Sequence, residues 1–394
     1  MTSLRFRKMV VPLFLVCAAA ALGAETVPPR TFFIPSARMA ALGGSHAALG
    51  DDLSALTNNP AGLYGARPRF HIAELSLALQ GPIFSIANIA LRGAAGEDMD
   101  DLLTDPAVTD FFKSVFVGAH LIGPLSFGYV GKGLGFSLVN STGLELVSRG
   151  STTFAVAAVE RAALHAGYAF RVHLPDPWES ALDIGVNLKA FLEGKNHFSR
   201  TLLEIPDLFS DGAGSFLDNP FSLTTGFGLD LGLRWTYRDN LMVGLVGRDV
   251  FTPTTRSDYA TLSGFLGDEV SGPAVHGRVP TDLSLGVMYR PPLGQTLRYL
   301  GDLKLLLDYR DILDFLTHPD STVNPLLKFG LGAEIRVLGA LQLRAGLSEG
   351  LPAWGFGLDY GVVKMHFAMF GAEMSSEPGM RPVFNIILGL EISL

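Results

Sequence analysis

The sequence predicts an all-β protein, a transmembrane antiparallel β-barrel of about 14 strands with a small unit of short helices before it. The chain is apolar overall, with a mean hydropathy of +0.32 and only 17% charged residues. After the N-terminal leader, no apolar run is long enough for a spanning helix. Instead, apolar residues alternate with small or polar ones over segments of about 10 residues, the length that a tilted barrel strand needs.

The N-terminus has the order of charge and hydropathy of an export signal. Three basic residues precede an apolar run over residues 9–22, and the small residues Gly23 and Ala24 follow it. The run is shorter than the ~20 residues of a spanning helix, so we expect a cleaved signal over residues 1–24. Cys17, the only cysteine, lies inside it, and the mature chain therefore cannot form a disulfide or a thiolate metal site.

Residues 25–66 do not alternate and form a separate unit. A run of small residues leads to the acidic pair Asp51 and Asp52, which can cap a short helix. Pro60 ends that helix, because the residue before a proline avoids the α region. The leucines of this unit would each gain roughly 1.5–3 kcal/mol from burial, so the unit should pack somewhere, and the barrel lumen is the nearest cover. The alternative is a linker that leads to the barrel.

The barrel is expected over residues 67–394. From Leu223 to Thr236, the apolar residues fall on one face and glycine, threonine and charged residues on the other. Phe227, Leu229 and Leu231 should face lipid. The same alternation recurs in the segments 182–189, 282–289, 303–310, 327–337, 353–360 and 384–394.

The inward face of these strands carries charges of both signs. They would either pair across neighbouring strands and brace the wall, or line a polar permeation path. The lumen-facing candidates are Asp230, Arg234, Lys328, Glu334, Arg336 and Arg344.

The connections alternate between long and short, which is typical of a membrane barrel and has no reason to occur in a soluble β-sandwich. The long connections 194–222, 250–279 and 311–326 should be extracellular. The number of strands depends on the region before residue 174. Strand-like segments there are 69–79, 83–91, 115–130 and 134–147, with a short helix over 107–114 and a hairpin over 151–173. Two strands before that hairpin make 14 in total, and four make 16.

The segment ARMAALGGSHAALGDDLSALTNNPAGL, about 27 residues, resembles the N-terminal signature of FadL-type outer-membrane proteins, including the PorV-like branch. The resemblance implies a 14-stranded barrel with a hatch in its lumen. It implies that Asp52 holds the hatch turn and that Asn59 to Ala61 join the hatch to the wall. The hatch motif comprises Asp51, Asp52, Ser54, Asn59, Pro60, Ala61 and Gly62.

The same resemblance implies passive uptake of hydrophobic or amphipathic small molecules, such as long-chain fatty acids, across the outer membrane of a didermal bacterium. One long connection contains apolar residues that could form a capture groove for such a ligand: Leu202, Leu203, Ile205, Leu208 and Phe209. One alternative is a PorV-like scaffold that binds a protein partner at the surface. Another is a general aqueous porin, favoured by the charged lumen. The expected partners are outer-membrane lipid, the hydrophobic ligand and the barrel-assembly machinery.

Catalysis, cofactors and nucleic acid are not expected. Residues 346–350 spell GLSEG, but a nucleophile elbow needs a helix after the serine, and here Pro352 and another strand follow. The nine histidines have no ligand spacing, and a net charge of −8 offers no basic surface for nucleic acid.

Overall fold

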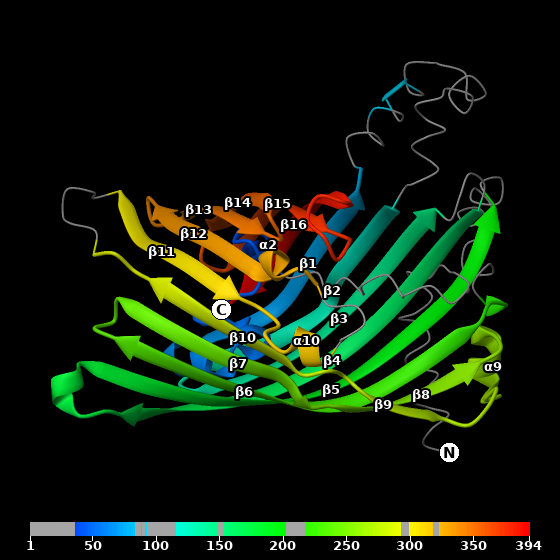
Figure 1. Ribbon diagram of the computed structural model, residues 1–394, viewed down its shortest axis with the longest axis horizontal. Helices are drawn as coiled ribbons and strands as arrows, with labels where there is room; N and C mark the ends of the chain where they lie inside the picture. Colours follow the sequence, from blue (N-terminus) through cyan, green and yellow to red (C-terminus); the bar gives the residue numbers. More distant parts are fainter. Residues whose placement is uncertain are drawn as a thin grey trace.

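The computed structural model describes residues 36–82, 116–148, 153–201, 217–292, 299–317 and 323–394, together with Asn88, Leu91 and Arg92. The strands of this part of the chain form one antiparallel sheet that closes on itself (Figure 1). The predicted all-β barrel is therefore confirmed. The predicted signal over 1–24, the helix over 107–114 and the capture-groove residues all lie outside the described residues.

Sixteen strand segments make up the sheet of the described residues. β8 continues β7 after Thr252, and β9 leads into β10, so the wall has 14 strands. The bounds are β1 (Arg69–Gly81), β2 (Phe116–Gly131), β3 (Leu134–Ser148), β4 (Thr153–His173), β5 (Ser180–Thr201), β6 (Phe221–Tyr237), β7 (Leu241–Phe251), β8 (Pro253–Tyr259), β9 (Val275–Arg278), β10 (Asp282–Tyr289), β11 (Leu300–Tyr309), β12 (Phe329–Val337), β13 (Leu341–Ser348), β14 (Leu351–Asp359), β15 (Val363–Glu373) and β16 (Pro382–Ser393). β1 pairs with β16 and closes the barrel.

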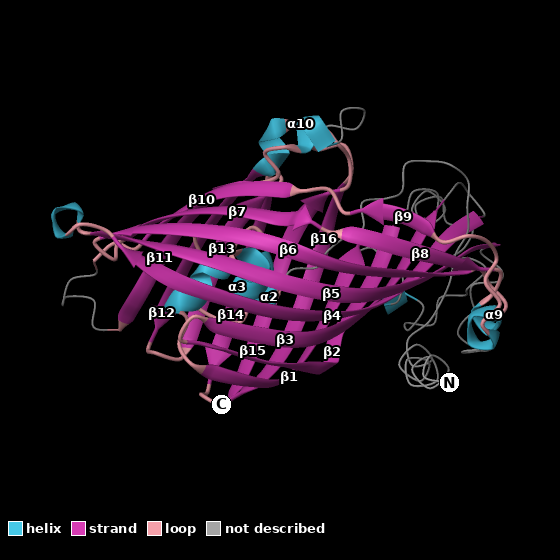
Figure 2. Ribbon diagram, turned by 90° about the horizontal axis from the view of Figure 1, so that it is seen from below, coloured by secondary structure: helices cyan, strands magenta, loops and turns pink. Residues whose placement is uncertain are grey.

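The helical elements are short. They are α2 (Ala37–Ala41), α3 (Ala55–Asn58), η1 (Pro60–Gly65), η2 (Asp176–Trp178), α9 (Leu262–Gly267), α10 (Asp314–Thr317) and η4 (Pro325–Lys328). Among the described residues, no helix combines the length and apolarity needed to cross a membrane. Figure 2 shows α2 and α3 enclosed by the strands, whereas α9 and α10 lie at their edges.

The alternation of side chains sets the two faces of the wall. On β6, Phe227 is 60% exposed and Leu231 is also exposed, whereas Asp230 between them is buried. The predicted lipid face is confirmed there and at Leu331, which is exposed while its neighbour Gly332 is buried. An apolar exterior on a closed barrel needs a bilayer around it, so this is an outer-membrane protein.

The predicted total of 14 strands is correct, but two assignments before residue 174 were wrong. Residues 153–173 are the single strand β4, paired with β5 along its whole length, from Thr153 opposite Thr201 to His173 opposite Ala181. No residue of β4 adopts the positive φ that a two-residue hairpin turn requires. Three strands, β1 to β3, precede it. Within the segment 83–91, expected to be a strand, the described residues Asn88 and Leu91 are helical.

The strands differ in length around the barrel, which corrects two of the predicted loops. β4 and β5 have 21 and 22 residues, whereas β10 and β13 have 8 each. The wall at β4 to β6 therefore rises well beyond the short strands (Figure 1). Residues 194–201 belong to β5, and much of 250–279 belongs to β8, α9 and β9.

β2 leaves its register in mid-strand. Pairing with β3 passes from Ile122 to Ser126 while β3 advances by two residues, and pairing with β1 lapses over the same stretch. The side chain of Asn140 accepts a hydrogen bond from the backbone N–H of Leu125 at 2.9 Å and so replaces a lost ladder bond. The wall is therefore bulged at β2.

Candidate functional site

Residues 36–66, here called the inner segment, cross the lumen and touch the wall at backbone distance. A Cβ added at Gly232 would lie 2.0 Å from Oδ1 of Asn59, and one at Gly244 would lie 2.1 Å from the carbonyl oxygen of Ala47. Only glycine permits so close an approach. The glycines that alternate with apolar residues along the strands thus make room for the inner segment.

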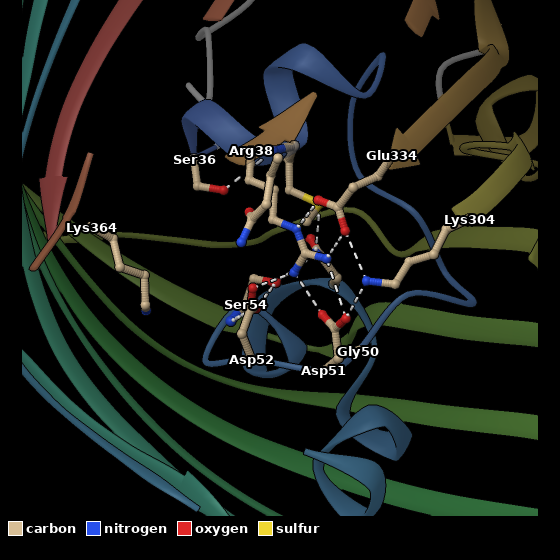
Figure 3. A network of polar contacts seen from close by, with 12 residues as sticks. Ser36, Arg38, Gly50, Asp51, Asp52, Ser54, Lys304, Glu334 and Lys364 are labelled. Carbon is tan, nitrogen blue, oxygen red and sulfur yellow. Dashed lines mark hydrogen bonds and ion pairs between the residues drawn. The ribbon is translucent and has the colours of Figure 1, made fainter. Parts of the chain in front are cut away.

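Arg38 is the centre of an ionic network that ties the inner segment to β11, β12 and β13 (Figure 3). Within the segment, its guanidinium donates to Asp51 at 2.6 Å and to Asp52 at 2.5 Å. It also donates to both carboxylate oxygens of Glu334 on β12, at 2.7 and 2.8 Å. Because Arg38 binds acids from both sides, it joins the fold of the segment to the wall.

Two wall cations complete the network. Nζ of Lys304 lies 2.9 Å from Asp51 and 2.8 Å from Glu334. Nε of Arg344 donates to Glu334 at 2.9 Å. Arg38, Lys304 and Arg344 thus face Asp51, Asp52 and Glu334, and the exposed carboxylate of Asp302 lies 3.1 Å from Lys304. Each buried ion of the cluster has an opposite charge beside it, as burial of ions requires.

The charges of the inner segment stabilise one another. Burial alone would raise the pKa of Asp51, but the positive charges of Arg38 and Lys304 hold that pKa well below its ordinary value. Burial would likewise lower the pKa of Arg38, but Asp51, Glu334 and Asp52 raise it well above its ordinary value. Both groups therefore stay charged at neutral pH.

A second anchor lies at His46. Its Nδ1 is 2.5 Å from Oδ2 of Asp308 on β11, and its Nε2 is 2.8 Å from the carbonyl oxygen of Leu42. The backbone N–H of Ala47 donates to the other oxygen of Asp308 at 2.6 Å. His46 and Asp308 are both fully buried, so these bonds are protected from competing water.

The third anchor is Asn59, at the turn between α3 and η1. Its Oδ1 accepts from the N–H of Ala61 at 3.0 Å, and its Nδ2 donates to the carbonyl oxygens of Ala47 and, on β6, Leu233, at 2.6 and 3.1 Å. One amide thus joins two parts of the inner segment and the wall. Arg234 adds a bond from β6 to the carbonyl oxygen of Gly50 at 3.1 Å and pairs with Asp183 at 3.0 Å.

The remaining hatch-motif residues lie in the same turns. The hydroxyl of Ser54 donates to Asp52 at 2.5 Å, and Pro60 and Ala61 are buried against Gly185 and Gly232 of the wall. A Cβ added at Gly62 would lie 2.5 Å from Cα of Gly50, so the segment packs tightly on itself.

The six lumen-facing candidates do not form one site. Glu334 and Arg344 belong to the Arg38 network, and Arg234 contacts the inner segment separately. Asp230 pairs with Lys189 on the next strand at 2.7 Å, and Lys328 pairs with Asp314 of α10 at 2.9 Å. Arg336 is half-buried and takes part in none of these contacts. Most of the inward charges thus brace the wall or hold the inner segment.

Sequence reasoning missed Arg38, His46 and Arg248. Arg248 of β7 bonds to Asp282 at 2.6 Å and to the carbonyl oxygen of Asn58 at 3.1 Å. A signal for Arg38 existed, since it is the only arginine or lysine between residues 36 and 66, in a segment whose only acidic residues are Asp51 and Asp52. Among the described residues, no group of three or more histidine, cysteine or acidic side chains could hold a metal ion.

The inner wall beside α2 is apolar. Ala37, Ala40 and Ala41 of α2 pack against side chains that project inward from β1, β14, β15 and β16. All of them are buried: Ala78, Ala353, Ala368, Phe370, Ala372 and Ile387. We call this surface the apolar stripe. A barrel lumen is normally polar, so the stripe is a distinct feature of this wall.

Comparison with known proteins adds solved barrels with low sequence identity. No family model and no curated protein matches the chain. The toluene transporter TbuX of Ralstonia pickettii aligns with 90% of this chain and 96% of its own, at 15% identity and a TM-score of 0.47. For a FadL homologue of Pseudomonas aeruginosa, the values are 92% and 99%, 13% identity and a TM-score of 0.44.

A barrel of another kind aligns as well. The translocator domain of the autotransporter NalP from Neisseria meningitidis covers 86% of this chain and 92% of its own, at 10% identity and a TM-score of 0.36. Similarity at this level is shared by barrels with different roles and does not distinguish between them.

Proposed function

We propose that this protein is an outer-membrane channel for the passive uptake of hydrophobic or amphipathic small molecules. The observation that carries the proposal is the apolar stripe beside α2, together with a lumen otherwise occupied by the inner segment. An apolar molecule needs a path of low polarity, and a stripe of alanine, phenylalanine and isoleucine side chains provides one along β1 and β14 to β16.

The two sides of the inner segment are held differently, which supports this route. Toward β11 to β13, the segment is fixed by buried charges around Arg38. Toward β14 to β16, α2 makes contacts between small apolar side chains, which lose little when an apolar ligand replaces them. A ligand could therefore pass beside α2 while the ionic anchors stay in place.

The inner segment argues against a general porin. It contacts the wall at distant strands, through α2 at β14 to β16 and through Pro60 and Ala61 at Gly185 of β5, and its buried core includes Leu42, Leu49, Leu56 and Leu63. A wide aqueous path needs an open lumen. The resemblance of residues 37–63 to the FadL-type signature supports an uptake channel with the inner segment as its hatch. It makes long-chain fatty acids the first ligand class to test.

The bulge of β2 offers a place where a ligand could leave the lumen sideways. Ladder bonds are already missing there, so widening the wall would break fewer of them than elsewhere. This exit is part of the proposal.

The experiment that tests the proposal removes residues 36–66 and measures both conductance and uptake. We expect a folded barrel that conducts ions strongly in planar bilayers and has lost selective uptake of labelled fatty acid into proteoliposomes. Folding is checked by the heat-dependent shift of the barrel in gel electrophoresis. Unchanged conductance in the deletion would contradict a lumenal hatch, and failure of the intact protein to take up any hydrophobic probe would contradict the channel.

A second candidate function, a scaffold for a protein partner, is favoured by β9. All four of its residues are exposed, and among the described strands it pairs only with β8, so it is a free sheet edge at the tall side of the wall. Free edges accept an extended segment of another chain. Replacing Val275 with proline should abolish such binding and leave uptake unchanged.

A further inference from the structure

A polar cluster lies on the inner face of β1, β2 and β3, away from the anchors described above. Gln80 and Glu145 both stand opposite Gly118, and His120 stands opposite Gly143. These glycines make room, since a Cβ added at Gly118 would lie 2.7 Å from Oε1 of Gln80. Nε2 of His120 lies 3.8 Å from Oε1 of Glu145, too far for a hydrogen bond.

Gln80 is the unusual member of this cluster. It is 1% exposed, and neither its Oε1 nor its Nε2 has a hydrogen-bond partner in the part of the chain that the structure describes. Nε2 of His120 also lacks one there. Buried polar atoms are almost always hydrogen-bonded, and the rare exceptions call for an explanation such as an absent ligand.

The cluster adjoins the apolar stripe. Gln80 is two residues from Ala78 on the same face of β1, and Ala78 stands opposite Ile387, which in turn stands opposite Ala368. A buried polar cluster thus lies at one end of a continuous apolar surface. This is the complement of an amphipathic molecule, with its head at Gln80 and its chain along the stripe.

We propose that Gln80, His120 and Glu145 bind the uncharged polar head of an amphipathic ligand whose head both donates and accepts hydrogen bonds. The inference rests on the proposed function and narrows its substrate class. The Gln80 amide offers one acceptor and two donors, and Glu145 adds an acceptor. The hydroxyl of a long-chain alcohol can accept from the amide N–H of Gln80 and donate its one proton to the amide oxygen or to Glu145. A carboxylate anion has no proton to donate and meets the charge of Glu145, and a hydrocarbon satisfies none of these groups.

The test compares 1-decanol, decanoate and decane, which share a chain length and differ in the head. Binding of each labelled probe to the full protein in nanodiscs is measured, with empty nanodiscs subtracted. We expect 1-decanol to bind most tightly. Gln80→Met should weaken the binding of 1-decanol by about tenfold and leave the binding of decane unchanged. A tenfold loss corresponds to about one hydrogen bond at the upper end of its usual contribution.

Thr252→Val is the matched control. It also removes a buried hydroxyl that lacks a partner among the described residues, but it lies at the junction of β7 and β8. It should leave all three affinities unchanged. If Gln80→Met does not fold, Glu145→Gln provides the second variant, and it should selectively weaken the binding of 1-decanol.

Three outcomes would overturn the inference. Equal binding of all three probes would leave the channel intact and exclude a polar head site. Tighter binding of decanoate than of 1-decanol would assign the site to anions. Absence of binding by any probe would remove the proposed channel as well.

Discussion

The Arg38 network and the Gln80 cluster are two buried polar groups in one lumen, and they are built in opposite ways. In the first, every charge meets an opposite charge within 3 Å, and the inner segment is joined to the wall. In the second, three strands bring polar side chains together, and three of their atoms find no partner among the described residues. A satisfied network stabilises one arrangement, whereas an unsatisfied one leaves capacity for a ligand.

Removing Arg38 should have the largest effect. Arg38→Met leaves Asp51, Asp52 and Glu334 with Lys304 and Arg344 as their only cations in this network, so buried charge is unbalanced. Breaking a buried ion pair from one side costs about 3–5 kcal/mol. We expect a loosened inner segment, seen as protease cleavage within residues 36–66 and as frequent opening in single-channel records. Protection equal to that of the unchanged protein would show that the apolar contacts alone hold the segment.

Asn59→Ala should have a smaller effect of the same sign. The substitution removes the donor to Ala47 and Leu233 and the acceptor for Ala61, and it leaves these buried backbone groups unpaired. Each unsatisfied group costs about 1–3 kcal/mol, part of which local rearrangement recovers. We expect a folded barrel with impaired uptake. Asn59→Asp keeps the acceptor for Ala61 but places a buried carboxylate against the carbonyl oxygens of Ala47 and Leu233, so it should impair uptake at least as much as Asn59→Ala.

Gln80→Met should change stability in the opposite direction. No described partner is lost, and an apolar side chain of similar volume replaces a buried amide, so the barrel should gain about 1 kcal/mol. The change in the free energy of unfolding is measured by urea unfolding of the protein in lipid vesicles. A loss of stability would mean that Gln80 has a structural role and that the two regions do not differ as argued. A gain coupled to weaker ligand binding is the usual trade between stability and function.

Periodicity allows the wall to be predicted and leaves most of the site unpredicted. The alternation from Leu223 to Trp235 predicts β6 and its lipid face because side chains of a strand must point to opposite sides. β4 was read as two strands because length alone suggested a turn where the backbone stays extended. Arg38 and His46 act through Glu334 and Asp308, which lie 296 and 262 residues away in the chain, and no local pattern encodes such pairing. The lack of a described hydrogen-bond partner for Gln80 likewise depends on how β1, β2 and β3 are placed in space.

The smallest expected effect is that of acid, and its sign follows from the network. The pKa of Asp51 is held well below its ordinary value of 3.8 by Arg38 and Lys304 against the effect of burial. A group with a lowered pKa contributes stability that is fully present above the ordinary pKa and is lost as the pH falls toward the lowered one. The raised pKa of Arg38 adds a contribution that persists at every pH below its ordinary value. Protease protection of the inner segment should therefore be constant from pH 8 to about pH 5 and decline only below about pH 4.

The Asp51→Asn variant is the control for this prediction. Its protease protection should decline less in acid, because the titrating carboxyl is gone. Release of the inner segment between pH 8 and 5 would show that another titrating group controls its attachment to the wall. The ion pairs around Arg38 would then not be what holds the inner segment in place.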